Sequence, residues 1–279
     1  MASYSTPRFR PVPERPQRAA ANPMTGDTIL ETRGLTKEFK GFVAVDRVDL
    51  KVRRGTIHAL IGPNGAGKTT TFNLLTKFLA PSGGTILFNG EDITRARPAD
   101  IARRGIIRSF QISAVFPNLT VLENVRVALQ RTIPTSYHFW KSARSLDVLN
   151  GKAMALLERV GLASLAHVLA ADLAYGRKRT LEITTTLAME PELMLLDEPT
   201  AGMGHEDVDR VKELIREAAA GRTVLMVEHN MSVVSGISDT ITVMARGTVL
   251  AEGPYAEVSR NPRVIEAYMG AEEEKLAHG

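Results

Sequence analysis

The segment GPNGAGKTT has residue types and spacing suited to holding phosphate groups. It matches the pattern G-x-x-x-x-G-K-[ST], follows the apolar run IHALI and precedes a helix-compatible run. Glycines let successive backbone N–H groups point inward, and the following helix adds its positive N-terminal end. A mere glycine-rich turn before a helix would not explain motif and context together. The predicted phosphate loop consists of Gly62, Pro63, Asn64, Gly65, Ala66, Gly67, Lys68, Thr69 and Thr70.

Within this loop two side chains have the chemistry to act on a nucleoside triphosphate. Lys68 is expected to reach the terminal phosphates, and Thr69 to offer its hydroxyl to Mg²⁺. A second candidate element is the acidic pair Asp197–Glu198, which follows the apolar run LMLL. Asp197 is placed to hold Mg²⁺ through water, and Glu198 to take a proton from an attacking water. Alone, such a pair is often a strand-to-loop exit, but with a phosphate loop it predicts ATP hydrolysis.

Buried strands must place these residues at one edge of a sheet. The short β-rich runs at 28–35, 42–52 and 56–62 predict an antiparallel layer that leads into a core strand. The apolar runs at 193–196 and 224–227 are typical of strands buried on both faces, and an amphipathic helical pattern separates them. We therefore expect an α/β fold with a P-loop NTPase core, a mostly parallel sheet, an antiparallel β layer and an inserted helical subdomain at about 112–188.

Composition predicts less ordered ends and limits the partners. Residues 1–26 are rich in proline and arginine and are expected to be a disordered tail, with a basic lipid anchor as the less favoured alternative. We expect the ATP-binding domain at 27–271 and a flexible C-terminal tail at 272–279. The chain has no cysteine, a net charge of +4 and no apolar run long enough to span a bilayer. These features favour a cytosolic location and give no reason to expect nucleic acid as a partner.

Five motifs in a fixed order resemble those of ABC ATPases. They are GPNGAGKTT, then Gln111 in RSFQ, LAYGR at 173–177, LMLLDEPTAGM, and VEHN with His229. The resemblance covers nearly everything after residue 28. Within that family, RSFQ, LTVLENV, Tyr175, DEPTAGM and the ending VIEAYMG are similar to the ATPases of branched-chain amino-acid importers.

The resemblance implies roles for further residues. Phe39 would stack on the adenine ring, although it could equally be a core aromatic of the β layer. Gln111 would contact Mg²⁺ and the attacking water, and His229 would bind the γ-phosphate and orient Glu198. The signature residues would face the nucleotide of a second ATPase subunit; they are Ala174, Tyr175, Gly176 and Arg177.

Three positions depart from the family pattern. Ala174 replaces the usual signature serine, Arg177 the usual glutamine, and Gly204 an aspartate in the loop after Glu198. Two interpretations of Arg177 stay open: its guanidinium compensates for the missing hydroxyl across the interface, or it is an exposed side chain at a helix start. The basic run from Arg177 to Arg179 could be a solvated helix face, and His205 is expected to begin a helix.

The resemblance also implies partners and a location. The chain would work at the cytoplasmic face of the membrane with transmembrane permease subunits, a second ATPase subunit that is identical or paralogous, and indirectly a solute-binding protein. Import is the favoured direction, and the sequence does not identify the solute. Two alternatives are a soluble ABC protein acting on ribosomes or DNA, and a nucleotide sensor. One phosphate loop and no sustained heptads disfavour the first, and the retained Lys68 and Glu198 disfavour the second.

Overall fold

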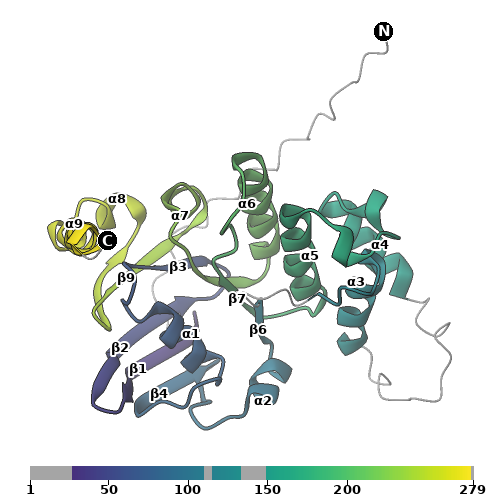
Figure 1. The fold of residues 1–279 in the computed structure, drawn as a ribbon. Helices are drawn as coiled ribbons and strands as arrows, with labels where there is room; N and C mark the ends of the chain where they lie inside the picture. The colour runs from purple at the N-terminus through teal and green to yellow at the C-terminus, as the bar shows by residue number, and fades with distance from the viewer. Residues whose placement is uncertain (1–26, 110–114, 133–148, 278–279) are drawn as a thin grey trace.

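Helix α1 (Lys68–Leu75) lies between two β-sheets (Figure 1). Its residues Phe72, Leu74 and Leu75 are fully buried and share one hydrophobic cluster with residues of both sheets. The computed structural model describes residues 27–109, 115–132 and 149–277, without the side chains from residue 270 onward. The segment that carries the phosphate loop is thus held from two sides.

The first sheet is antiparallel throughout, with the strand order β2-β1-β4-β5. From Val48 to Arg53 buried and exposed residues alternate, because one face packs on the core and the other meets solvent. The predicted antiparallel layer is therefore confirmed. Its strands are β1 (Thr28–Phe39), β2 (Phe42–Arg53), β4 (Gly83–Phe88) and β5 (Glu91–Asp92).

The second sheet has the order β10-β9-β3-β8-β7-β6, and every neighbouring pair is parallel except β10 with β9. All residues of β3, β7 and β8 are buried, and for β7 and β8 the apolar runs at 193–196 and 224–227 predict this. The mostly parallel core is confirmed. Its strands are β3 (Ile57–Ile61), β6 (Ile106–Ser109), β7 (Leu193–Asp197), β8 (Thr223–Val227), β9 (Thr240–Ala245) and β10 (Thr248–Gly253).

Helices cover the face of this sheet opposite α1. The amphipathic segment between β7 and β8 forms α6 (His205–Ala219), which buries Val208, Val211 and Ile215 in a cluster shared with α7 (Met231–Ile237). His205 begins this helix, as expected. The remaining helices outside the middle segment are α2 (Pro98–Arg103), α8 (Tyr255–Val258) and α9 (Pro262–Ala277).

The middle of the chain is helical and has a core of its own. Helix α3 starts at a capping box, in which the Thr120 hydroxyl accepts from the Glu123 amide and the Glu123 carboxylate accepts from Thr120. These hydrogen bonds hold the pKa of Glu123 below its usual value. The elements of this segment are α3 (Val121–Leu129), η1 (Gln130–Thr132), α4 (Asn150–Arg159), η3 (Ala163–Leu165), η4 (Ala170–Asp172) and α5 (Tyr175–Ala188).

The predictions for the two tails, residues 1–26 and 272–279, have different outcomes. Residues 1–26 lie outside the described residues. Helix α9 continues to Ala277, so the tail expected from residue 272 is helical over most of its length. The reason lies in its sequence AEEEKLA, which consists of strong helix formers. Within the described part of the chain, no helix is both long and apolar enough to cross a membrane.

Candidate functional site

The phosphate loop connects β3 to α1 and is wedged between other parts of the chain. Gly62 has φ 149°, and a Cβ at this position would lie 2.1 Å from the Met244 carbonyl oxygen of β9. Gly67, the N-cap of α1, has φ 97°, and its Cβ would lie 2.6 Å from the Ala44 carbonyl oxygen of β2. Only glycine fits at either position. The Ala66 carbonyl also accepts from the Gly247 amide at 3.1 Å, so both sheets hold the loop.

Lys68 begins α1 and folds back over this loop. Its ammonium donates to the carbonyls of Gly62 and Pro63 at 2.8 and 2.9 Å. Burial lowers the pKa of Lys68, and the carboxylates of Glu198 and Asp197 oppose that shift. The lysine therefore lies where a phosphate chain on the loop would meet it, close to both predicted acidic residues.

Asp197 ends β7 and is completely buried. Its Oδ2 accepts from the Arg108 guanidinium at 2.5 Å, while its Oδ1 is buried without a hydrogen-bond partner. Arg108 comes from the neighbouring strand β6 and also donates to Asn73 of α1 at 2.6 Å. Arg108 is a site residue that the motifs did not predict; a charged residue directly after the apolar pair Ile106–Ile107 was the available signal.

The structure brings Glu198 and His229 together at the ends of β7 and β8. The Glu198 amide donates to the Val227 carbonyl, and the His229 Nδ1 lies 3.7 Å from a Glu198 carboxylate oxygen. This separation is longer than a hydrogen bond. Glu198 has φ 45°, an uncommon conformation for a residue other than glycine that is often found at functional sites. Both side chains are partly exposed, so a substrate can reach them.

A buried arginine supports the strained backbone at Glu198. Arg179 of α5 donates to the carbonyls of Asp197, Glu198 and Pro199 at 2.6, 3.1 and 3.3 Å. It also forms an ion pair with Glu182, one helical turn along. The interpretation of Arg177–Arg179 as a solvated face is therefore wrong for Arg179. The signal that could have found it was the glutamate three positions later on the same helix face.

The signature residues lie at the start of α5. Ala174 is its N-cap, and Ala174, Tyr175 and Arg177 are all exposed. The Tyr175 hydroxyl donates to the Ala201 carbonyl at 3.0 Å in the loop after β7. Gly176 is buried, and a Cβ there would lie 2.3 Å from the Asp207 carboxylate of α6.

Within one chain the signature and the phosphate loop stay apart. Among the described residues, no hydrogen bond or ion pair joins the signature to residues 62–70. The expected contact of the signature with the nucleotide of a second chain stays a prediction.

Two other predicted residues have different outcomes. Phe39 ends β1 with 41% of its surface exposed, under the ammonium of Lys37 at 5.0 Å, so the alternative of a core aromatic is wrong. It pairs with Phe42 in the hairpin that leads to Ala44, whose carbonyl touches the phosphate loop. Gln111 lies outside the described residues.

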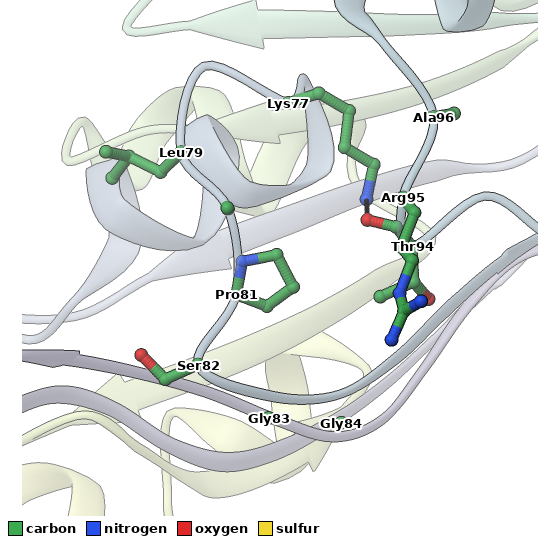
Figure 2. A pocket seen from close by; sticks show the side chains of 10 residues that line it. Lys77, Leu79, Pro81, Ser82, Gly83, Gly84, Thr94, Arg95 and Ala96 are labelled. Atoms are coloured by element: carbon green, nitrogen blue, oxygen red, sulfur yellow. Dashed lines mark hydrogen bonds between the residues drawn. The ribbon is translucent and has the colours of Figure 1, made fainter.

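A cavity of about 510 Å³ lies beyond the C-terminal end of α1 (Figure 2). Lys77 lines it and donates to the Thr94 carbonyl at 3.3 Å, and burial lowers the pKa of Lys77 to about 8. None of the predicted site residues lines this cavity. It is separate from the phosphate loop, which precedes the other end of the helix.

The site has oxygen atoms suited to Mg²⁺. Asp197 has an unpartnered buried carboxylate oxygen, and the Thr69 hydroxyl at the second position of α1 is exposed. Among the described residues, no three His, Cys, Asp or Glu side chains form a metal-binding group. Mg²⁺ usually takes one or two protein ligands and completes its shell with waters and substrate phosphates. The donor set fits that mode of binding.

Two family models match the chain. The ABC transporter model matches residues 45–201, and the model of the branched-chain amino acid ATP-binding cassette transporter matches residues 248–274. The first spans more than half of the chain and includes the phosphate loop, the signature and the acidic pair. The second includes β10, α8 and most of α9.

Similar proteins cover the chain almost end to end. The high-affinity branched-chain amino acid transport ATP-binding proteins LivG of Salmonella typhimurium and BraF of Pseudomonas aeruginosa are each 41% identical, over 87% of this chain and 98% of theirs. A probable LivG of Archaeoglobus fulgidus is 36% identical over 90% of this chain and 99% of its own.

The solved structures agree. The ADP conformation of an ATP-binding cassette of an ABC transporter matches with a TM-score of 0.75 and 32% identity, over 87% of this chain and 99% of that one. A nucleotide-free cassette matches with a TM-score of 0.74 and 31% identity, over 86% and 98%. The comparisons give no support to the soluble or sensor alternatives. The chain therefore belongs to the ABC transporter family, as an ATP-hydrolysing subunit of the ATP-binding cassette type.

Proposed function

We propose that this chain supplies the energy for importing branched-chain or chemically related amino acids. The observation that carries the proposal is the match of residues 248–274 to the branched-chain amino acid cassette model, together with 41% identity to LivG and BraF across nearly their whole length. It acts at the cytoplasmic face of the membrane, bound to separate permease subunits that a solute-binding protein supplies.

The site residues divide the work of hydrolysis. The phosphate loop and Lys68 bind the triphosphate, and Phe39 stacks on the adenine. Asp197, Thr69 and Gln111 would hold Mg²⁺, which would neutralise phosphate charge. Glu198 takes a proton from the attacking water. As the bond from that water to the γ-phosphorus forms, the bond from phosphorus to the bridging oxygen breaks, and ADP leaves with the electron pair.

His229 orients Glu198 and contacts the γ-phosphate, and its position 3.7 Å from the Glu198 carboxylate supports this role. The signature residues contact the nucleotide of a second cassette, so that two chains enclose two ATP molecules. The exposure of Ala174, Tyr175 and Arg177 supports such an arrangement.

The test is co-purification of the chain with its native membrane subunits, followed by reconstitution into vesicles. ATP hydrolysis and uptake of labelled leucine, isoleucine or valine should both rise when the solute-binding protein is added. Hydrolysis that responds to a chemically unrelated solute, and to none of these amino acids, would contradict the proposed substrate class. Hydrolysis without any membrane subunit in the native complex would contradict the transport role.

A further inference from the structure

Glu228 is a fully buried carboxylate at the end of β8, directly before His229. Its Oε1 accepts from the Thr200 amide at 3.1 Å and from the Thr200 hydroxyl at 2.5 Å. Its Oε2 accepts from the amides of His229 and Asn230 at 2.9 and 3.0 Å. Four donors surround the group, which matches the acceptor-only chemistry of an ionised carboxylate.

These four hydrogen bonds join the two loops that carry Glu198 and His229. Thr200 follows Glu198 by two residues after β7, and His229 and Asn230 lead from β8 into α7. Strands β7 and β8 are paired as far as Asp197 and Val227. Beyond that pair the two segments separate into different turns. Glu228 is thus the group that continues the connection between them past the end of the sheet.

We propose that Glu228 is a positioning residue for hydrolysis: it sets the separation of the Glu198 and His229 side chains by holding their loops to one carboxylate. The inference rests on the roles proposed above for those two residues. Glu228 is buried beneath the turns and acts only through them. A backbone shift of a fraction of an ångström in either turn would move the 3.7 Å contact between His229 and Glu198.

The test measures kcat and KM for ATP in Glu228→Gln, His229→Ala and the double variant, using the purified full-length chain. Glutamine has nearly the shape of glutamate, but its NH₂ group is a donor and would face the donors of Thr200 or the amides of His229 and Asn230. The hydrogen bonds on that side of the group are therefore lost. We expect kcat to fall about tenfold, which corresponds to roughly 1.4 kcal/mol in the barrier, with KM changed less than about twofold. On the His229→Ala background Glu228→Gln should add no further loss.

A matched control separates positioning from stability. Glu123 accepts from the amide and hydroxyl of Thr120, as Glu228 does from Thr200, but in the helical segment. Glu123→Gln should lower thermal stability without changing kcat. If Glu228→Gln folds poorly, Thr200→Val removes only the hydroxyl donor and should lower kcat by a smaller factor, while Thr200→Ser should restore it.

The outcomes distinguish the inference from the function on which it rests. Parental kcat in Glu228→Gln, or losses that multiply in the double variant, would overturn the role of Glu228 and leave that of His229 intact. Parental kcat in His229→Ala would instead overturn the role of His229 and the inference with it. Equal losses of kcat in Glu123→Gln and Glu228→Gln would identify the effect as general destabilisation.

Discussion

The phosphate loop and the signature, which we propose as the two halves of a nucleotide site, are built in different ways in this chain. Backbone encloses the loop: the carbonyls of Ala44 and Met244 leave no room for a side chain at its glycines. Lys68 donates to a carbonyl of the loop. The signature presents exposed side chains, and only Gly176 is packed tightly. The contacts that hold the loop lie within the chain, whereas the exposed signature side chains leave a surface that a second subunit could contact.

Loss of the loop's cation should have the largest effect. Lys68→Ala is expected to abolish ATP binding or turnover, because the phosphates lose the only side-chain cation within the loop. Nucleotide titration and phosphate release measure this. Lys77→Gln, at the other end of α1, is the matched control and should behave like the parent. Unchanged affinity and turnover in Lys68→Ala would disprove the assignment of the loop.

Glu198→Gln should keep ATP bound but slow hydrolysis about 10²–10⁴-fold, since general-base assistance is lost. Single-turnover phosphate release checks this. Glu192→Gln is the control, because Glu192 precedes β7 at the opposite end of the strand. If the Glu198 variant turned over at the parental rate, another group would have to be the base.

His58 of β3, the strand that leads into the phosphate loop, should make the free energy of unfolding depend on pH. Burial lowers the pKa of His58 to about 4, and its Nε2 bonds to the Thr242 hydroxyl at 2.7 Å. In the unfolded chain His58 binds a proton below about pH 6.5, whereas in the folded chain it binds one only below about pH 4. The free energy of unfolding therefore decreases as the pH is lowered from about 6.5 to about 4.

Between pH 7 and pH 5 the free energy of unfolding should fall by about 2 kcal/mol more in the parent than in His58→Gln. Urea titrations at both pH values measure the difference. Identical losses in the two proteins would show that His58 does not contribute to acid destabilisation.

Substitutions in the signature should have the smallest effect, and only on the association of two chains. If Arg177 compensates for the hydroxyl that Ala174 lacks, Arg177→Gln should weaken ATP-dependent dimerisation severalfold, and less so on the Ala174→Ser background. Sedimentation of Glu198→Gln variants with ATP measures this. Additive effects, or a silent Arg177→Gln, would mean that Arg177 is simply an exposed side chain.

Sequence predicted best what depends on neighbours along the chain. The loop, the acidic pair, the two buried strands and α6 all follow from local patterns, and the structure places the loop and the acidic pair at the C-terminal ends of β3 and β7. Arg108, Arg179 and Glu228 were not identified as part of the site, because each acts on a segment distant in sequence. The glutamate three positions after Arg179 is a local signal that this arginine is paired, but it does not indicate the three carbonyls between Asp197 and Pro199 that the arginine meets.

The strand order has a consequence for the timing of synthesis. β3 lies between β8 and β9, and the first glycine of the loop is shaped by the carbonyl of Met244. The loop leaves the ribosome early, yet Met244 follows its first glycine by about 180 residues, roughly ten to forty seconds at about 5–20 residues per second. During that interval a glycine-rich loop and an apolar strand have no native neighbours in the sheet. We therefore expect the nascent chain to recognise nucleotide only near the end of its translation.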